Sequence, residues 1–132
     1  MTIPPNSPIH ANREILVSLR LIGSEGGWIG RVRDLGGPPG FVVCRTTCGA
    51  DAVQRVELGG LAAAIVADPR PADALTVVRM IRSVDRRLPC WLITERASRQ
   101  ALEAALSLEV VSVITHPGEL NRLEGALMRY SF

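Results

Sequence analysis

Leu61-Ala62-Ala63-Ala64-Ile65-Val66-Ala67-Asp68 is the stretch of sequence that decides the fold. Seven consecutive apolar residues, with no polar residue alternating among them, are typical of a strand that is buried on both faces of a sheet. The run ends abruptly at a carboxylate, as expected when the last residue of a central parallel strand emerges into a cleft. We therefore predict a central parallel strand at 61–67 that delivers Asp68 to a potential functional site.

The rest of the chain alternates between short apolar runs and segments with helical spacing. Strands are predicted at 15–22, 41–45, 90–94 and 110–114, and helices at 28–35, 50–58, 75–81, 98–106 and 120–130. Alternation on this scale implies a parallel sheet with right-handed crossovers and helices on both faces. The sequence therefore predicts an α/β fold with five strands, each followed by a helix.

Length and composition favour one globular domain. The chain has 132 residues, and 47% of them are apolar, which is enough to bury a core. Residues 1–12 are polar and contain three prolines, so we expect a flexible N-terminal arm followed by a domain at 13–132. The longest apolar run falls far short of the roughly 20 residues that span a bilayer, so we expect a cytoplasmic protein without membrane contact.

Charge and cysteine content exclude several classes of protein. A net charge of +2 is too small to indicate direct nucleic-acid binding. Three cysteines without close paired spacing argue against a disulfide framework or a structural zinc site. Four arginines, at positions 79, 82, 86 and 87, lie close together in the sequence. They form either a solvated helix face and loop or a docking patch for an acidic partner.

Polar residues follow several of the predicted strands. Asp68, Thr94 and His116 come at or just after the ends of the third, fourth and fifth strands, and Glu25 follows the first. Because ligands of such sheets gather at the carboxyl ends of the strands, we expect Asp68, Thr94 and His116 to lie within one cleft, which Glu25 could join.

The second half of the chain carries a resemblance to a known family in its segments 64–68, 81–89 and 91–94, in Pro71 and in His116-Pro117. These segments resemble the receiver domain of bacterial response regulators. The resemblance covers roughly residues 13–130 and is most specific from Leu61 onward. It implies a flavodoxin-like sheet with the strand order 2-1-3-4-5.

The resemblance also implies roles for the residues at the strand ends. Asp68 matches the phosphoacceptor, Thr94 matches the phosphate-sensing threonine, and His116 stands where the family has a lysine. Glu25 is the nearest candidate for the acidic pair that holds Mg²⁺ in the family. In such a site the carboxylate attacks a phosphoryl group, and the cation and the lysine neutralise its oxygens.

The sequence departs from the family at most supporting positions. The acidic pair is reduced to Glu25 at most, and His116 carries only a conditional charge. Glu95 follows the threonine where a small residue is usual, Val113 replaces an aromatic residue, and the loop after Asp68 is short. We therefore expect a non-enzymatic pseudo-receiver that needs no cofactor and binds a protein partner such as a kinase, an output domain or a regulator.

Other functions remain open. Asp68 could still be a working phosphoacceptor of a two-component system, in which case Mg²⁺ would be required. A small-molecule or nucleotide-binding module is a further possibility, although neither G-x-G-x-x-G nor G-x-x-x-x-G-K-[ST] occurs. A homodimer through the helix at 98–106, the strand at 110–114 and the helix at 120–130 is also expected. Its motivation is the number of large apolar residues in the last helix, namely Leu120, Leu123, Leu127, Met128 and Tyr130.

Overall fold

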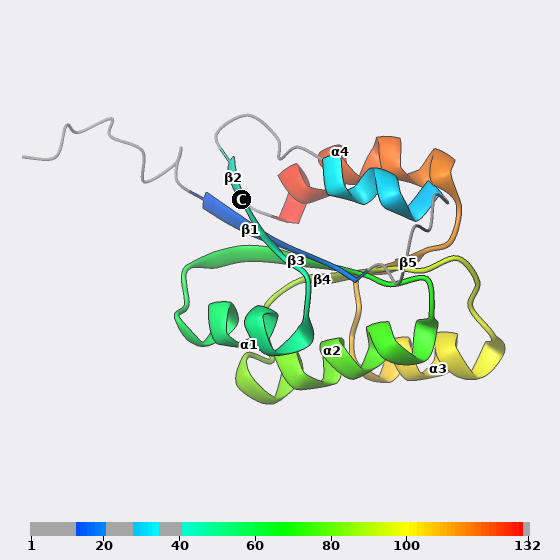
Figure 1. Cartoon of the computed structure of the whole chain (residues 1–132), viewed down its shortest axis with the longest axis horizontal. Helices are drawn as coiled ribbons and strands as arrows, with labels where there is room; N and C mark the ends of the chain where they lie inside the picture. Colours follow the sequence, from blue (N-terminus) through cyan, green and yellow to red (C-terminus); the bar gives the residue numbers. More distant parts are fainter. Residues whose placement is uncertain (1–12, 21–27, 35–40, 131–132) are drawn as a thin grey trace, which may run out of the picture.

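The computed structural model describes residues 13–20, 28–34 and 41–130, and a five-stranded parallel sheet forms its centre (Figure 1). The strand order β2-β1-β3-β4-β5 confirms the predicted topology. The strands are β1 (Arg13–Leu19), β2 (Phe41–Thr46), β3 (Leu61–Ala67), β4 (Cys90–Ile93) and β5 (Ser112–Ile114). The predicted N-terminal arm at 1–12 lies outside the described residues.

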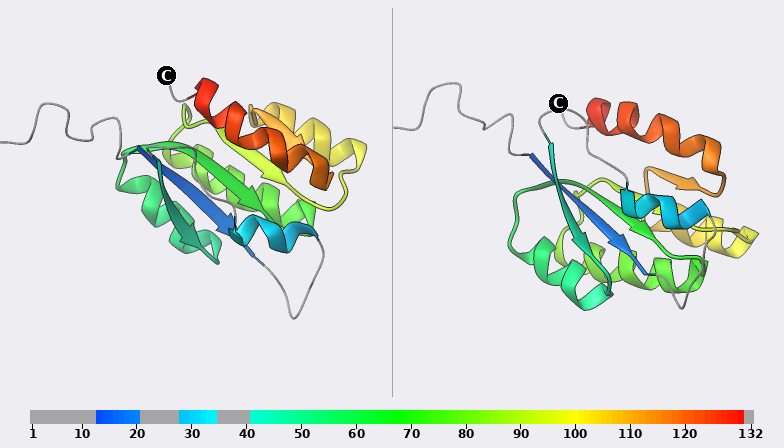
Figure 2. Two further views of the ribbon diagram at one scale, coloured as in Figure 1. Left: turned by 90° about the horizontal axis from the view of Figure 1, so that it is seen from above. Right: turned by 45° about the horizontal axis from the view of Figure 1, so that its top comes forward.

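Helices cover both faces of the sheet, as Figure 2 shows from two further directions. One face carries three α-helices: α1 (Gly49–Glu57), α2 (Pro71–Val84) and α3 (Arg99–Ser107). The opposite face carries the 3-10 helix η1 (Trp28–Asp34) and the last helix, α4 (Leu120–Tyr130), which follows the short 3-10 turn η2 (Pro117–Glu119).

The strand β3 joins two separate halves of the core. Ala64 and Val66 pack into the cluster under α1, α2 and α3, whereas Ala63 and Ile65 pack into the cluster under η1 and α4. This alternation explains why the strand is apolar at every position. Trp91 on β4 is the largest fully buried side chain and belongs to the second cluster.

The structure differs from the prediction at the first strand, the first helical segment and the fifth strand. The first strand ends at Leu19, where its pairing with Ala67 at the end of β3 also ends, and residues 21–22 lie outside the described residues. The first helical segment is a 3-10 helix rather than an α-helix. The fifth strand begins at Ser112 because the Val110 N–H donates back to the Ala105 carbonyl and completes the end of α3.

In the described parts of the chain, no helix has the length and apolar character needed to cross a bilayer.

Candidate functional site

Asp68 is held by the first turn of the loop between β3 and α2. Its N–H donates to the Ile93 carbonyl at 3.0 Å, which keeps it in line with β4. Its Oδ1 accepts a hydrogen bond from the Arg70 N–H at 2.9 Å. The residue is only 3% exposed, so one oxygen of the carboxylate is fixed by the main chain within a nearly closed site.

Arg20 is the cation beside this carboxylate. Its N–H donates to the Ala67 carbonyl at 3.1 Å, so the residue continues from β1 directly alongside the end of β3. The Arg20 Nε lies 3.8 Å from Asp68 Oδ2, and its Nη2 lies 3.5 Å from Asp73 Oδ2 on α2. One guanidinium group therefore bridges two carboxylates at the edge where the family would hold a divalent cation.

Burial has the largest effect on the pKa of Asp68. Removal of the carboxylate from water raises its pKa above the ordinary value of 3.8. The Arg70 N–H and the Arg20 guanidinium act in the opposite direction, because both favour the charged form. The arginine thus offsets part of the cost of keeping a buried carboxylate ionised.

The Thr94 hydroxyl is already engaged with the protein. Its Oγ1 donates to the Pro69 carbonyl at 3.1 Å, and the residue is fully buried. Pro69 follows Asp68 directly, so this bond ties the end of β4 to the loop that carries the carboxylate. The structure therefore brings Asp68 and Thr94 together at one edge, with the hydroxyl directed at the main chain.

The sequence also predicts His116 in this cleft, with Glu25 as a further candidate. His116 is exposed, and its Nδ1 accepts a hydrogen bond from the Gly118 N–H at 3.1 Å within its own turn. It has no hydrogen bond or ion pair with Asp68 or Thr94 in the part of the chain that the structure describes. Glu25 lies outside the described residues, and Glu95 is exposed.

Arg20 and Asp73 are not among the residues predicted from the sequence. The first strand was predicted to continue to residue 22, which placed Arg20 inside the strand and directed attention to Glu25. The pairing of Leu19 with Ala67 ends the strand three residues earlier and places Arg20 next to Asp68. Asp73 could have been found by its position, because it lies in the first turn of the helix that follows the loop.

Comparisons with solved structures agree with the observed fold. The receiver domain of a sensor histidine kinase from Pseudomonas aeruginosa, with a magnesium ion in its active site cleft, is 23% identical, with a TM-score of 0.65 and coverage of 91% of this chain and 98% of that one. The chain has the fold of a response-regulator receiver domain. A receiver-fold response regulator from Thermotoga maritima, in complex with Mg²⁺-BeF, is 14% identical, with a TM-score of 0.63 and coverage of 89% and 98%.

A pilus assembly protein from Burkholderia thailandensis shares the receiver fold at higher identity. It is 27% identical, with a TM-score of 0.63, over 90% of this chain and 98% of that one. A pilus assembly-related protein from Burkholderia pseudomallei is 26% identical, with a TM-score of 0.63, over 92% and 90%. No family model matches the sequence, and no curated protein sequence is significantly similar to it.

The described residues of this receiver fold do not fit a resident Mg²⁺ ion. The ion prefers oxygen ligands and is usually held by one or two carboxylates. Here the two carboxylates at the site, Asp68 and Asp73, share the Arg20 guanidinium, which would repel a second cation. Among the described residues, no group of three or more acidic, histidine or cysteine side chains could hold a metal.

Replacement of Asp68 by asparagine is expected to stabilise the protein at neutral pH. The folded-state pKa of Asp68 is raised, so the folded protein favours the protonated carboxyl. The contribution of this group to the free energy of unfolding is therefore fully present below the ordinary pKa of 3.8, and it is lost as the pH rises through the higher folded-state pKa. The asparagine side chain would keep an oxygen for the Arg70 N–H and would remove the buried charge. We expect Asp68→Asn to raise Tm by a few degrees at neutral pH and to have little effect well below pH 3.8.

Thermal unfolding followed by circular dichroism at both pH values measures this effect. Asp73→Asn is the matched control, because Asp73 contacts the same arginine but its side chain is 34% exposed. A fall in Tm of Asp68→Asn at neutral pH would mean that the ion pair with Arg20 outweighs the cost of burial.

Proposed function

We propose that this chain is a signalling domain of the receiver fold that acts in the cytoplasm by binding a protein partner, without Mg²⁺-dependent phosphorylation of Asp68. The observation that supports this proposal is the Arg20 guanidinium, which lies 3.8 Å from Asp68 Oδ2 and also contacts Asp73. The Arg20 guanidinium then stands in place of an exchangeable Mg²⁺ ion, and the domain acts by binding rather than by catalysis.

The surroundings of Asp68 support this proposal. A phosphoryl group would bring a charge of about −2 next to the Asp73 carboxylate. It would also have to displace the Arg20 contact from Asp68 Oδ2, while the Thr94 hydroxyl donates to a main-chain carbonyl instead. His116, which stands at the family's lysine position, is directed into its own turn. Each of these contacts opposes a stable aspartyl phosphate.

Incubation with acetyl phosphate and Mg²⁺, followed by intact mass measurement, tests the proposal. We expect the mass of the protein to stay unchanged, while a receiver domain with a complete acidic pair gains a phosphoryl group in the same tube. The alternative is a working phosphoacceptor in which the Arg20 guanidinium itself offsets the phosphoryl charge. A phosphate adduct that disappears in Asp68→Ala would establish that alternative and reject the proposal.

We further propose that α3, β5 and α4 form the partner-binding face and that a second copy of the chain binds there. The apolar residues of α4 that suggested pairing are largely used in the core, since Leu123 and Leu127 are buried. Within this face the exposed large apolar side chains lie on α3 instead, where Leu102 is 46% and Leu106 is 77% exposed. Helical residues four apart share one side, so the two leucines form one apolar strip.

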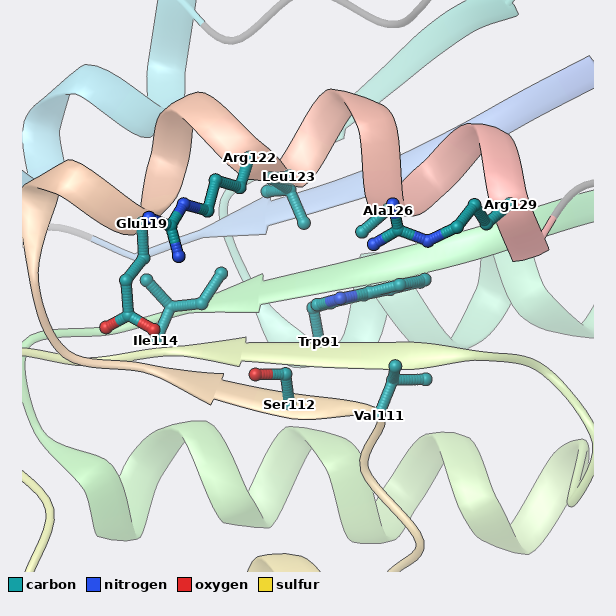
Figure 3. A pocket seen from close by; sticks show the side chains of 9 residues that line it. All are labelled: Trp91, Val111, Ser112, Ile114, Glu119, Arg122, Leu123, Ala126 and Arg129. Carbon is teal, nitrogen blue, oxygen red and sulfur yellow. The ribbon is translucent and has the colours of Figure 1, made fainter.

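A groove beside β5 continues this face on the other side of the sheet. It has a volume of about 270 Å³ and lies between β5 and α4, over the ring of Trp91 (Figure 3). Arg122 and Arg129, two turns apart on α4, line its outer side. Because β5 is the edge strand of the sheet, its outer side is open to a second chain in the described structure.

Substitution of both exposed leucines by serine is expected to weaken self-association. Leu102→Ser with Leu106→Ser removes two apolar side chains from the proposed interface, at about 1.5–3 kcal/mol for each side chain that is fully buried there. The dissociation constant of the dimer should therefore rise at least tenfold, as measured by light scattering over a range of protein concentrations. Leu58→Ser is the control, because Leu58 is 78% exposed and lies after α1, away from this face. A wild-type chain that stays monomeric at high concentration would contradict the dimer.

The likeness to pilus assembly proteins supports a second, more specific candidate. The two structures with 26% and 27% identity bear that description, and both cover at least 90% of this chain. We propose on this basis that the partner belongs to a pilus-assembly system. Deletion of the gene in its native host should then remove surface pili seen by electron microscopy, and re-expression of the wild-type chain should restore them. Normal pili after deletion would reject this candidate.

A further inference from the structure

A second polar groove lies at the far end of α2 from Asp68. Asp68 precedes the first turn of this 14-residue helix, whereas the groove is lined by Arg79 and Arg82 near its end and by Arg86 just beyond it. The helix spans about 21 Å at 1.5 Å per residue, so the groove is separate from the carboxylate site. Its other wall is the end of α3, from Ser107 to Glu109, and its volume is about 580 Å³.

Arg82 forms the inner wall of the groove and is fully engaged with the main chain. Its guanidinium donates to the carbonyls of Leu108 at 2.8 Å, Leu88 at 2.6 Å, Asp85 at 3.3 Å and Glu109 at 3.3 Å. Carbonyl groups carry no formal charge, so the positive charge of Arg82 stays uncompensated by any of these contacts.

Arg79 and Arg86 form the outer wall and have no such engagement. Both are exposed, and neither has a hydrogen bond or ion pair with the residues that the structure describes. Glu109 is the single carboxylate among the lining residues. Three guanidinium groups therefore share the groove with one carboxylate, so the groove attracts anions.

We propose that this groove binds an acidic segment of a partner protein. Arginine is suited to this role because its planar group can hold a carboxylate through two parallel hydrogen bonds. The lining contains no aromatic side chain on which a nucleotide base could stack. The Ser83 and Ser107 hydroxyls donate to carbonyls of their own helices, which leaves Arg79 and Arg86 as the recognition groups.

The proposal can be tested with a peptide of six glutamates as the probe. Titration of the ¹⁵N-labelled full chain, followed by NMR, should shift the amide signals at the ends of α2 and α3. The double variant Arg79→Gln with Arg86→Gln should weaken binding at least tenfold, and Glu109→Gln should strengthen it. Arg82 is left unchanged because it supports the fold.

A matched control separates this site from general attraction to a basic protein. Arg31→Gln with Arg33→Gln removes the same charge from η1 on the opposite face of the sheet, and it should weaken binding less than twofold. Equal losses in the two double variants, or shifts spread over the whole surface, would overturn the proposal. Tighter binding of ATP than of the peptide at the same signals would also overturn it, because the groove would then be a nucleotide site.

Discussion

Replacement of Arg20 by aspartate is expected to convert the Asp68 site into one that binds a divalent cation and accepts a phosphoryl group. The guanidinium lies within 4 Å of both Asp68 and Asp73, so the substitution changes a nearby +1 charge to −1. Two unit charges at this distance interact by about 4 kcal/mol at the effective dielectric of a protein surface. We therefore expect the affinity for Mn²⁺ to rise at least tenfold.

Two measurements check this expectation. Electron paramagnetic resonance of free Mn²⁺ reports the affinity for the cation, and intact mass after incubation with acetyl phosphate and Mg²⁺ reports phosphorylation. Arg20→Gln is the matched control, because it removes the positive charge without adding a ligand and should show only a small gain. If Arg20→Asp binds the cation no better than the wild type, the arginine is not what keeps metal away from this site.

Among the substitutions described, replacement of Arg82 by alanine is expected to cause the largest loss of stability. One guanidinium group holds four carbonyls that belong to the end of α2, the loop before β4 and the end of α3. Hydrogen bonds to charged groups contribute about 1.5–3 kcal/mol each, although the contributions are not additive and solvent would replace some of them. We expect a loss of about 2–4 kcal/mol and a fall in Tm of about 10 °C.

The conformation at the end of α3 explains why Arg82 contributes to stability. Glu109 has a φ of 56°, a left-handed conformation that favours glycine, and its carbonyl and that of Leu108 both accept from Arg82. Urea unfolding measures the expected loss, with Arg79→Ala as control because Arg79 is exposed on the same helix. A variant Arg82→Lys should recover only part of the stability, since an ammonium group cannot reach the four acceptors as a planar fork does. Equal stability of the Arg82 and Arg79 alanine variants would contradict this role.

The topology was predictable because it depends on patterns that span whole elements. The apolar run at 61–67 could only be buried between two layers of helices, and the alternation around it fixed the class of sheet. The polar residues that end β3 and β4 followed from the same argument, which is why Asp68 and Thr94 were placed correctly beside one another.

The details of the site were not predictable because they depend on single contacts between elements. The apolar pattern of the first strand continues through Leu21 and Ile22, so nothing local shows that its pairing with β3 ends at Leu19. The register that pairs Leu19 with Ala67 is what places Arg20 beside Asp68. Similarly, the position of His116 followed from the end of β5, but its orientation depends on the turn in which it accepts from the Gly118 N–H.

A counter-ion that is part of the polypeptide has a fixed stoichiometry. Cellular magnesium and phosphoryl donors rise and fall with metabolic state, whereas the guanidinium of Arg20 stays at one per chain until the protein is degraded. The presence of a cation beside Asp68 is then set at translation. If the domain acts without phosphorylation, as proposed, a cell would change its output through the number of copies it makes, the place where it keeps them and the time for which they last.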